Sequence, residues 1–118
     1  MRALVLAGFV VLAAAGAAIA HAFLDHAEPP VGATVAAPPS ALRLYFSEPI
    51  EPLFSGVTLS AIGGQPVATA AASVDPQNRA LLILPLPPLT AGRYRVSWHV
   101  VSADTHRTEG SYEFEVGR

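Results

Sequence analysis

The chain has 118 residues, contains no cysteine, and carries nine acidic residues against seven basic ones, all of them arginine. This length allows one domain of ordinary size, and the missing cysteines exclude disulfides, thiolate metal sites and blue-copper centres. A mildly acidic chain without lysine offers no basic surface to nucleic acid or to an anionic membrane, so we expect neither as a partner.

Residues 1–20 have the three parts of a secretory signal peptide: a charged start, an apolar middle and an end rich in small residues. An A-x-A cleavage pattern ending at Ala20 predicts a mature domain of residues 21–118 that begins with His21. A second such pattern two residues later would instead place Phe23 first. An uncleaved membrane anchor is the other alternative, although the stretch is at the short limit for spanning a bilayer.

The mature domain contains short stretches with the two-residue alternation that is typical of half-buried β-strands. The clearest stretch, residues 93–101, turns Tyr94 and Trp98 toward the core and is followed by a short polar segment. Proline and glycine turns separate the stretches. The expected strands span residues 22–27, 41–47, 55–62, 67–74, 80–84, 93–101 and 111–116.

Seven short strands without any helical periodicity predict an all-β fold, a seven-stranded antiparallel β-sandwich. The spacing from Gly92 to Tyr94 at the start of a strand is typical of a tyrosine corner, in which the tyrosine hydroxyl bonds to the backbone just upstream. We therefore assign Tyr94 and Trp98 to the core or to that corner, with no functional role.

Histidine and aspartate side chains suggest a metal site. A histidine at a free amino terminus offers its α-amine and its ring Nδ1 to one metal, so cleavage before His21 would create a chelating pair. Asp104 and His106, which follow a strand, would add a carboxylate and an imidazole. Three nitrogens and one oxygen suit Cu(II) in a tetragonal arrangement, although zinc also accepts these ligands.

Any single histidine can equally be an ordinary surface residue. His99 lies on the strand face opposite Trp98, where it would be exposed. A regular strand would point His26 and His21 to opposite faces, so we assign neither His99 nor His26 to a site. With no cysteine, and with Met1 as the only methionine, the mature domain has no soft sulfur ligand for Cu(I). We therefore expect an oxidised copper ion and no electron-carrier role.

Several longer motifs, in order along the mature domain, resemble the CopC copper-resistance proteins. The motifs are His21-Ala-Phe-Leu, Pro29-Pro-Val-Gly-Ala, Leu44-Tyr-Phe-Ser-Glu-Pro, Leu89-Thr-Ala-Gly-Arg-Tyr-Arg-Val-Ser-Trp, Val101-Ser-Ala-Asp-Thr-His and Gly110-Ser-Tyr-Glu-Phe. The resemblance implies a periplasmic Greek-key sandwich, immunoglobulin-like or cupredoxin-like, that binds Cu(II) through its amino-terminal histidine. Only this resemblance, and no spacing in the sequence, predicts that the two ends of the mature domain meet at one site.

The resemblance also implies a role for four residues. His21 matches the amino-terminal ligand, Asp104 the carboxylate ligand and His106 the second imidazole ligand. Glu48 matches an acidic position at or near the metal, either as a weak axial ligand or as a hydrogen-bond partner of the His21 amine. Some family members carry a methionine-rich Cu(I) site, whereas residues 60–72 here contain no methionine, which indicates the Cu(II)-only type.

We therefore expect a periplasmic Cu(II)-binding protein without enzymatic activity, for copper buffering, resistance or delivery to a CopD-type membrane copper transporter. Two alternatives stay open. A histidine-brace copper monooxygenase also begins with a histidine, but it needs open coordination positions that Asp104 and His106 would fill here. An immunoglobulin-like interaction module with incidental histidines would not bind copper tightly.

Overall fold

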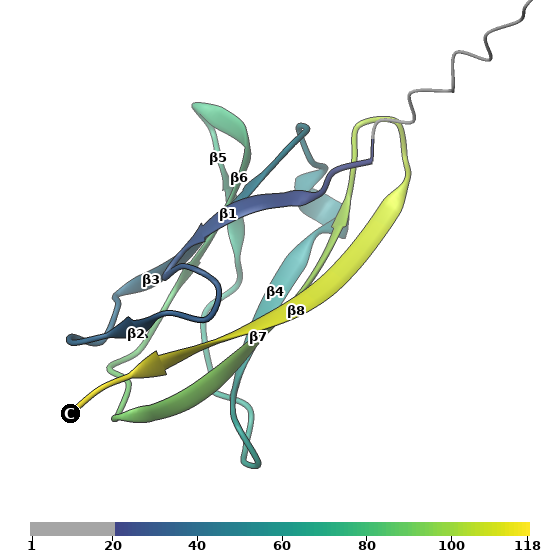
Figure 1. Cartoon of the computed structure of the whole chain (residues 1–118). Coiled ribbons are helices and arrows are strands. Elements are labelled where there is room, and N and C mark those ends of the chain that lie inside the picture. The colour runs from purple at the N-terminus through teal and green to yellow at the C-terminus, as the bar shows by residue number, and fades with distance from the viewer. Residues whose placement is uncertain (1–20) are drawn as a thin grey trace, which may run out of the picture.

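The computed structural model describes residues 21–118, which form two four-stranded β-sheets packed face to face (Figure 1). The elements are β1 (Leu24–Glu28), β2 (Thr34–Val35), β3 (Ala41–Phe46), the 3-10 turn η1 (Pro52–Phe54), β4 (Gly56–Ala61), β5 (Ser73–Asp75), β6 (Asn78–Pro85), β7 (Gly92–Val101) and β8 (Arg107–Val116). One sheet has the strand order β1-β3-β6-β5 and the other β2-β8-β7-β4. Over residues 21–118, no helix is long and apolar enough to cross a bilayer. The predicted signal peptide lies outside the described residues.

The predicted β-sandwich is confirmed, but the strand count and one strand direction differ. β2 is an additional strand, and it runs parallel to the end of β8, whereas all the other strand pairs are antiparallel. Two residues are too few to display a two-residue alternation, so the sequence pattern could not reveal β2. The sandwich therefore has eight strands and one parallel pair.

The weakest predicted strand, residues 67–74, is extended but mostly unpaired. Only Ser73–Asp75 forms a strand, and Val67 N donates to the carbonyl oxygen of Leu59 at 2.8 Å. Alanine-rich sequence buries little apolar surface and has low strand propensity, so alternation alone overestimated this element. Strand β8 is longer than the sequence predicted, because it begins at Arg107 rather than at residue 111.

Alternating side chains of β3, β7 and β8 fill the core, and Trp98 lies near the end of β7 that leads to the polar segment. Trp98 packs edge-on against Phe46, with ring centroids 5.1 Å apart. Gly110 is its register partner on β8, and a Cβ at that position would lie 2.7 Å from Trp98 Cζ2. Glycine is therefore required there, because any side chain would displace the indole.

The two buried tyrosines of this sheet differ in how their hydroxyls are satisfied. Tyr94 donates to the carbonyl oxygen of Thr90 at 2.7 Å, which confirms the predicted tyrosine corner. The hydroxyl of Tyr112 has no hydrogen-bond partner within residues 21–118, and burial raises its pKa. The Tyr94 hydroxyl therefore stabilises the fold, whereas burial of the unpaired Tyr112 hydroxyl destabilises it.

These two tyrosines give a matched pair of substitutions. Tyr94→Phe is expected to lower the free energy of unfolding by about 0.5–1.5 kcal/mol, because the corner hydrogen bond is lost. Tyr112→Phe is expected to leave that free energy unchanged or to raise it by up to about 1 kcal/mol, since it removes an unpaired buried hydroxyl. Urea unfolding of the mature domain measures both values. Equal destabilisation by the two substitutions would contradict this assignment.

Candidate metal site

The first described residues are held firmly between β3 and β8. Ala22 is fully buried, and its carbonyl oxygen accepts a hydrogen bond from Thr108 Oγ1 at 2.7 Å. Ser47 Oγ donates to the carbonyl oxygen of His21 at 3.3 Å and accepts from the Phe23 amide at 2.9 Å. The Ser47 amide donates to the carbonyl oxygen of Phe23 at 2.8 Å. His21 therefore leaves the sandwich from a fixed backbone position.

A tight turn between β7 and β8 carries Asp104 and His106. The Ser102 amide donates to the carbonyl oxygen of His106 at 2.9 Å, and the Thr105 amide donates to the carbonyl oxygen of Ser102 at 2.8 Å. Thr105 has a φ of 71°, a left-handed conformation that a β-branched residue rarely adopts. Such strain persists only where surrounding contacts fix the backbone, so the turn has a defined shape.

Ser102 orients Asp104 within this turn. Ser102 is buried, and its Oγ donates to Asp104 Oδ1. That hydrogen bond holds the pKa of Asp104 below its usual value, and the nearby His106 ring lowers it further, although partial desolvation opposes both. Asp104 is thus an ionised carboxylate near neutral pH, in the form that a metal ion requires.

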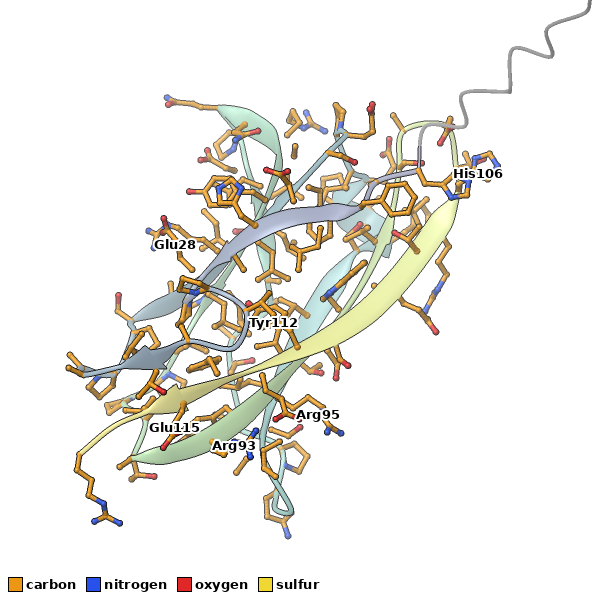
Figure 2. The ribbon with its side chains drawn as sticks, in the orientation of Figure 1. Glu28, Arg93, Arg95, His106, Tyr112 and Glu115 are labelled. Atoms are coloured by element: carbon orange, nitrogen blue, oxygen red, sulfur yellow. The ribbon has the colours of Figure 1, made fainter. Side chains whose placement is uncertain are left out.

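The beginning of β1 and the β7–β8 turn lie at the same end of the sandwich (Figure 1). The His21 and His106 rings meet there. The two rings are stacked with centroids 4.8 Å apart and planes 24° apart. His106 Nδ1 is 3.2 Å from Asp104 Oδ2, so the three residues form a continuous chain of contacts. Figure 2 shows His106 at this tip, far from the labelled Arg93 and Glu115 at the other end of the same sheet.

Glu48 lies close to this group but not in direct contact with all of it. It borders a hollow of about 190 Å³ that Asp104 and Ser102 also line. Between residues 21 and 118, no hydrogen bond or ion pair joins Glu48 to His21 or to His106. The structure therefore brings Glu48 to the side of the site that Asp104 occupies.

The other two histidines lie elsewhere. His26 stacks on Tyr45 at 4.2 Å and pairs with Asp25 at 2.8 Å, on the outer face of the first sheet. His99 pairs in register with Glu109 on β8 and lies against Gly56 on β4. Within residues 21–118, neither His26 nor His99 stacks on or forms an ion pair with His21 or His106.

The side chains alone do not complete a metal site. Among the residues that the structure describes, no three histidine, aspartate or glutamate side chains are grouped closely enough to hold one ion. His21 and His106 are in contact, and His106 is in contact with Asp104, but the three do not converge on one point. A complete site needs at least one further donor and some reorientation of the two rings.

Sequence patterns did not identify three hydroxyl residues that support the site. Ser47 and Thr108 hold the backbone at His21, and Ser102 holds Asp104. Isolated serine and threonine residues carry no periodic signal. Only their position next to predicted ligands, in Phe46-Ser47-Glu48 and Ser102-Ala103-Asp104, could have drawn attention to two of them.

The chain is similar to proteins of one family over nearly all of the described residues. Residues 24–117 match the family described as the CopC domain. Protein YobA of Escherichia coli is 43% identical over 98 residues, which cover 82% of this chain and 79% of that protein. Copper resistance protein C of Escherichia coli is 39% identical over 119 residues, covering 95% of this chain and 94% of the relative.

Solved structures agree with the fold. The crystal structure of CopC from Methylosinus trichosporium superimposes with a TM-score of 0.78 at 35% identity, covering 82% of this chain and 94% of that one. The structure of PcoC, a methionine-rich copper resistance protein from Escherichia coli, gives 0.72 at 37% identity, covering 82% of this chain and 99% of PcoC.

A longer relative contains a similar segment as one of its parts. The copper transport protein CutJ of Bacillus subtilis is 27% identical over 100 residues, which cover 84% of this chain but only 18% of CutJ.

Replacing Ser102 with alanine should raise the pKa of Asp104 toward its ordinary value of 3.8, because the hydrogen bond to the carboxylate is lost. The lowered folded-state pKa stabilises the fold above the unfolded-state value, and this contribution disappears as the pH falls through the folded-state value. The stability lost in Ser102→Ala is therefore expected to be larger at about pH 7 than at about pH 3.

An NMR titration of the Asp104 carboxyl and urea unfolding at the two pH values measure these effects. Ser97→Ala, on the exposed face of β7, is the control and should leave the Asp104 titration unchanged. An unchanged Asp104 pKa in Ser102→Ala would show that Ser102 does not hold the carboxylate.

Proposed function

The chain belongs to the CopC family, and from this premise we propose that it is an exported Cu(II)-binding protein for copper buffering, resistance or delivery. The names of its relatives support copper as the metal, since they describe copper resistance and copper transport. No relative reported above is described as an enzyme, and we propose a binding role without catalysis.

Export supplies the donor that the side chains lack. Removal of residues 1–20 in the periplasm converts the peptide nitrogen of His21 into a free α-amine, which has an ordinary pKa of about 7.7–8.0. This amine and the ring Nδ1 of His21 can chelate one ion. The proposed ligands are therefore the His21 amine, His21 Nδ1, one carboxylate oxygen of Asp104 and one ring nitrogen of His106, a set that suits tetragonal Cu(II).

The contact between the His21 and His106 rings is the observation that carries this proposal. It joins residues 85 positions apart in the sequence, and it is supported by backbone bonds on both sides. Because hydrogen bonds fix the backbone at both residues, the proposed site forms by rotation of the two side chains, which would aim both rings at one ion. Glu48 is proposed as a weak axial ligand or as a partner of the amine, on the side of Asp104.

The proposed oxidation state follows from ligand chemistry. Cu(I) prefers thioether and thiolate sulfur, and PcoC is described as methionine rich. In this chain Met1 is the only methionine and cysteine is absent, so the mature domain offers nitrogen and oxygen alone. Nitrogen and oxygen ligands favour Cu(II).

A membrane copper transporter of the CopD type is proposed as the partner. Support comes from CutJ, in which a segment similar to this chain is part of a much longer copper transport protein. Joining two modules in one polypeptide raises their effective concentration for each other, which is useful only if the modules act together. We propose that the present chain meets an equivalent partner as a separate molecule.

The free amino terminus gives the sharpest test. One extra alanine ahead of His21 in the mature protein moves the amine away from the ring, so Cu(II) affinity should fall by several orders of magnitude, with each tenfold loss equal to about 1.4 kcal/mol. Competition with a chromophoric chelator measures the affinity, and the mass of the exported protein establishes whether His21 comes first. His26→Ala, remote from the site, should bind Cu(II) as the parent does. Unchanged affinity after the alanine insertion would refute the amino-terminal chelate.

Bound Cu(II) should be released as the pH falls below about 6, because protons then compete with the ion for nitrogen ligands. The carboxylate of Asp104 stays ionised over this range, since its pKa is held below the usual value. The d–d absorption or electron paramagnetic resonance signal of bound Cu(II), recorded from neutral to acid pH, measures release. Retention of the ion at about pH 4 would contradict nitrogen ligation.

A further inference from the structure

We propose that three exposed apolar side chains around the metal end form the surface on which the copper-accepting transporter docks. This apolar rim consists of Phe23, Leu53 and Phe54, whose exposed fractions are 59%, 89% and 62%. The inference rests on the proposed delivery of copper to a membrane transporter, and it identifies which part of the surface makes that contact.

The rim lies next to the proposed copper ligands. The segment that carries η1 is bonded along the β7–β8 turn: the Glu51 amide donates to the carbonyl oxygen of Val101 at 2.8 Å, and the Ala103 amide donates to that of Pro49 at 3.3 Å. Ile50 also forms a β-bridge with Ser102. Leu53 and Phe54 therefore stand beside the turn that holds Asp104 and His106, and η1 lies at this end in Figure 1.

Phe23 completes the rim on the other side of the site. Its ring stacks on His21 with centroids 5.8 Å apart, and its backbone is fixed to Ser47 by two hydrogen bonds. The stacked rings thus run from Phe23 through His21 to His106. Apolar side chains flank the ligands on two sides.

The fold itself does not require these side chains. No residue of η1 is buried, so Leu53 and Phe54 add nothing to the core. The structure describes five large exposed hydrophobic residues, and the other two, Val31 and Ile62, lie at the opposite end, where β8 ends and β7 begins. Single exposed apolar residues are ordinary, but three gathered around one site are typical of an interaction surface.

A protein partner fits this surface better than a lipid bilayer. The acidic residues Glu48, Glu51 and Asp104 lie among the rim residues, and an anionic bilayer would repel them. Among residues 21–118, Arg79 and Arg107 are the only arginines near this end, fewer than the four to eight basic residues typical of a segment that binds anionic lipid. The complementary partner surface is apolar with basic residues at its edge.

The size of the rim suits a short-lived contact. Three apolar side chains bury far less area than a permanent interface needs, and small interfaces are typical of transient encounters. A carrier must leave after it transfers its ion, so a weak, specific contact meets the functional requirement. Contact at the rim would also place the acceptor's own ligands beside His21 and His106.

The test uses the full mature protein and a purified CopD-type transporter in nanodiscs. The double variant Leu53→Ser with Phe54→Ser should bind the transporter at least tenfold more weakly than the parent, while its Cu(II) affinity by chelator competition stays unchanged. Val31→Ser with Ile62→Ser removes the two large exposed apolar side chains at the far end, and it should bind the transporter as the parent does. Phe23 is left intact because it contacts His21.

Each of the other possible results would contradict one part of the proposal. Equal binding by the parent and the Leu53/Phe54 variant, or equal loss in the Val31/Ile62 variant, would refute the rim as the docking surface. Equal binding of the parent to empty nanodiscs would assign the rim to lipid, and self-association that the Leu53/Phe54 variant abolishes would assign it to a second copy. A parent that binds Cu(II) but not the transporter would refute the proposed partner and the docking surface, while leaving the copper site intact.

Discussion

The burial of Ala22 is the constraint on which the candidate site depends. Residues at the beginning of a domain usually fray, because few contacts hold them. Here Ala22 is inserted into the core and its carbonyl oxygen is bound by Thr108, so the chain is ordered before β1 begins pairing with β3 at Leu24. The conformational entropy of ordering the His21 backbone is lost during folding, so it would not oppose the proposed binding of a metal at His21.

The opposite half of the site is rigid for a different reason. β7 and β8 pair over ten residues each, and the indole of Trp98 lies directly on the backbone of Gly110 close to the connecting turn. The turn itself is closed by Ser102, whose backbone and side chain bond to His106 and Asp104 respectively. The proposed ligands Asp104 and His106 therefore stand at the end of the most extensively paired strands of the sheet, where a loop has little freedom.

The sequence predicted those parts of the fold that depend on periodic burial. Alternation in β7 identified Tyr94 and Trp98 as core side chains, and the spacing from Gly92 to Tyr94 identified the tyrosine corner. β2 was missed because two residues contain no period, and residues 67–72 were overestimated because alanine alternates without driving burial.

For the candidate site, the sequence predicted which residues could act as ligands but not how they come together. Nothing local to the sequence relates His21 to His106, because their contact depends on how β1, β3 and β8 come together, and only resemblance to a family supplied that link. The supporting roles of the Ser47, Ser102 and Thr108 hydroxyls were not predicted, although Ser47 and Ser102 lie close in sequence to predicted ligands. Each hydroxyl supports the site because the fold brings a hydrogen-bond partner next to it, and no spacing along the sequence predicts that partner.

The exposure of the proposed ligands links the geometry of the site to the proposed role. The side chains of His106 and Asp104 are 52% and 43% exposed, and they stand at the tip of the sandwich. An ion held there can be approached by a second protein's ligands while the first ligands are still bound, so transfer can proceed by stepwise ligand exchange without unfolding. A closed site in the core would also bind the ion, but it would release the ion only slowly. Rigid backbone beneath exposed ligands combines specific capture with release to a partner, which is the requirement for a protein that carries copper.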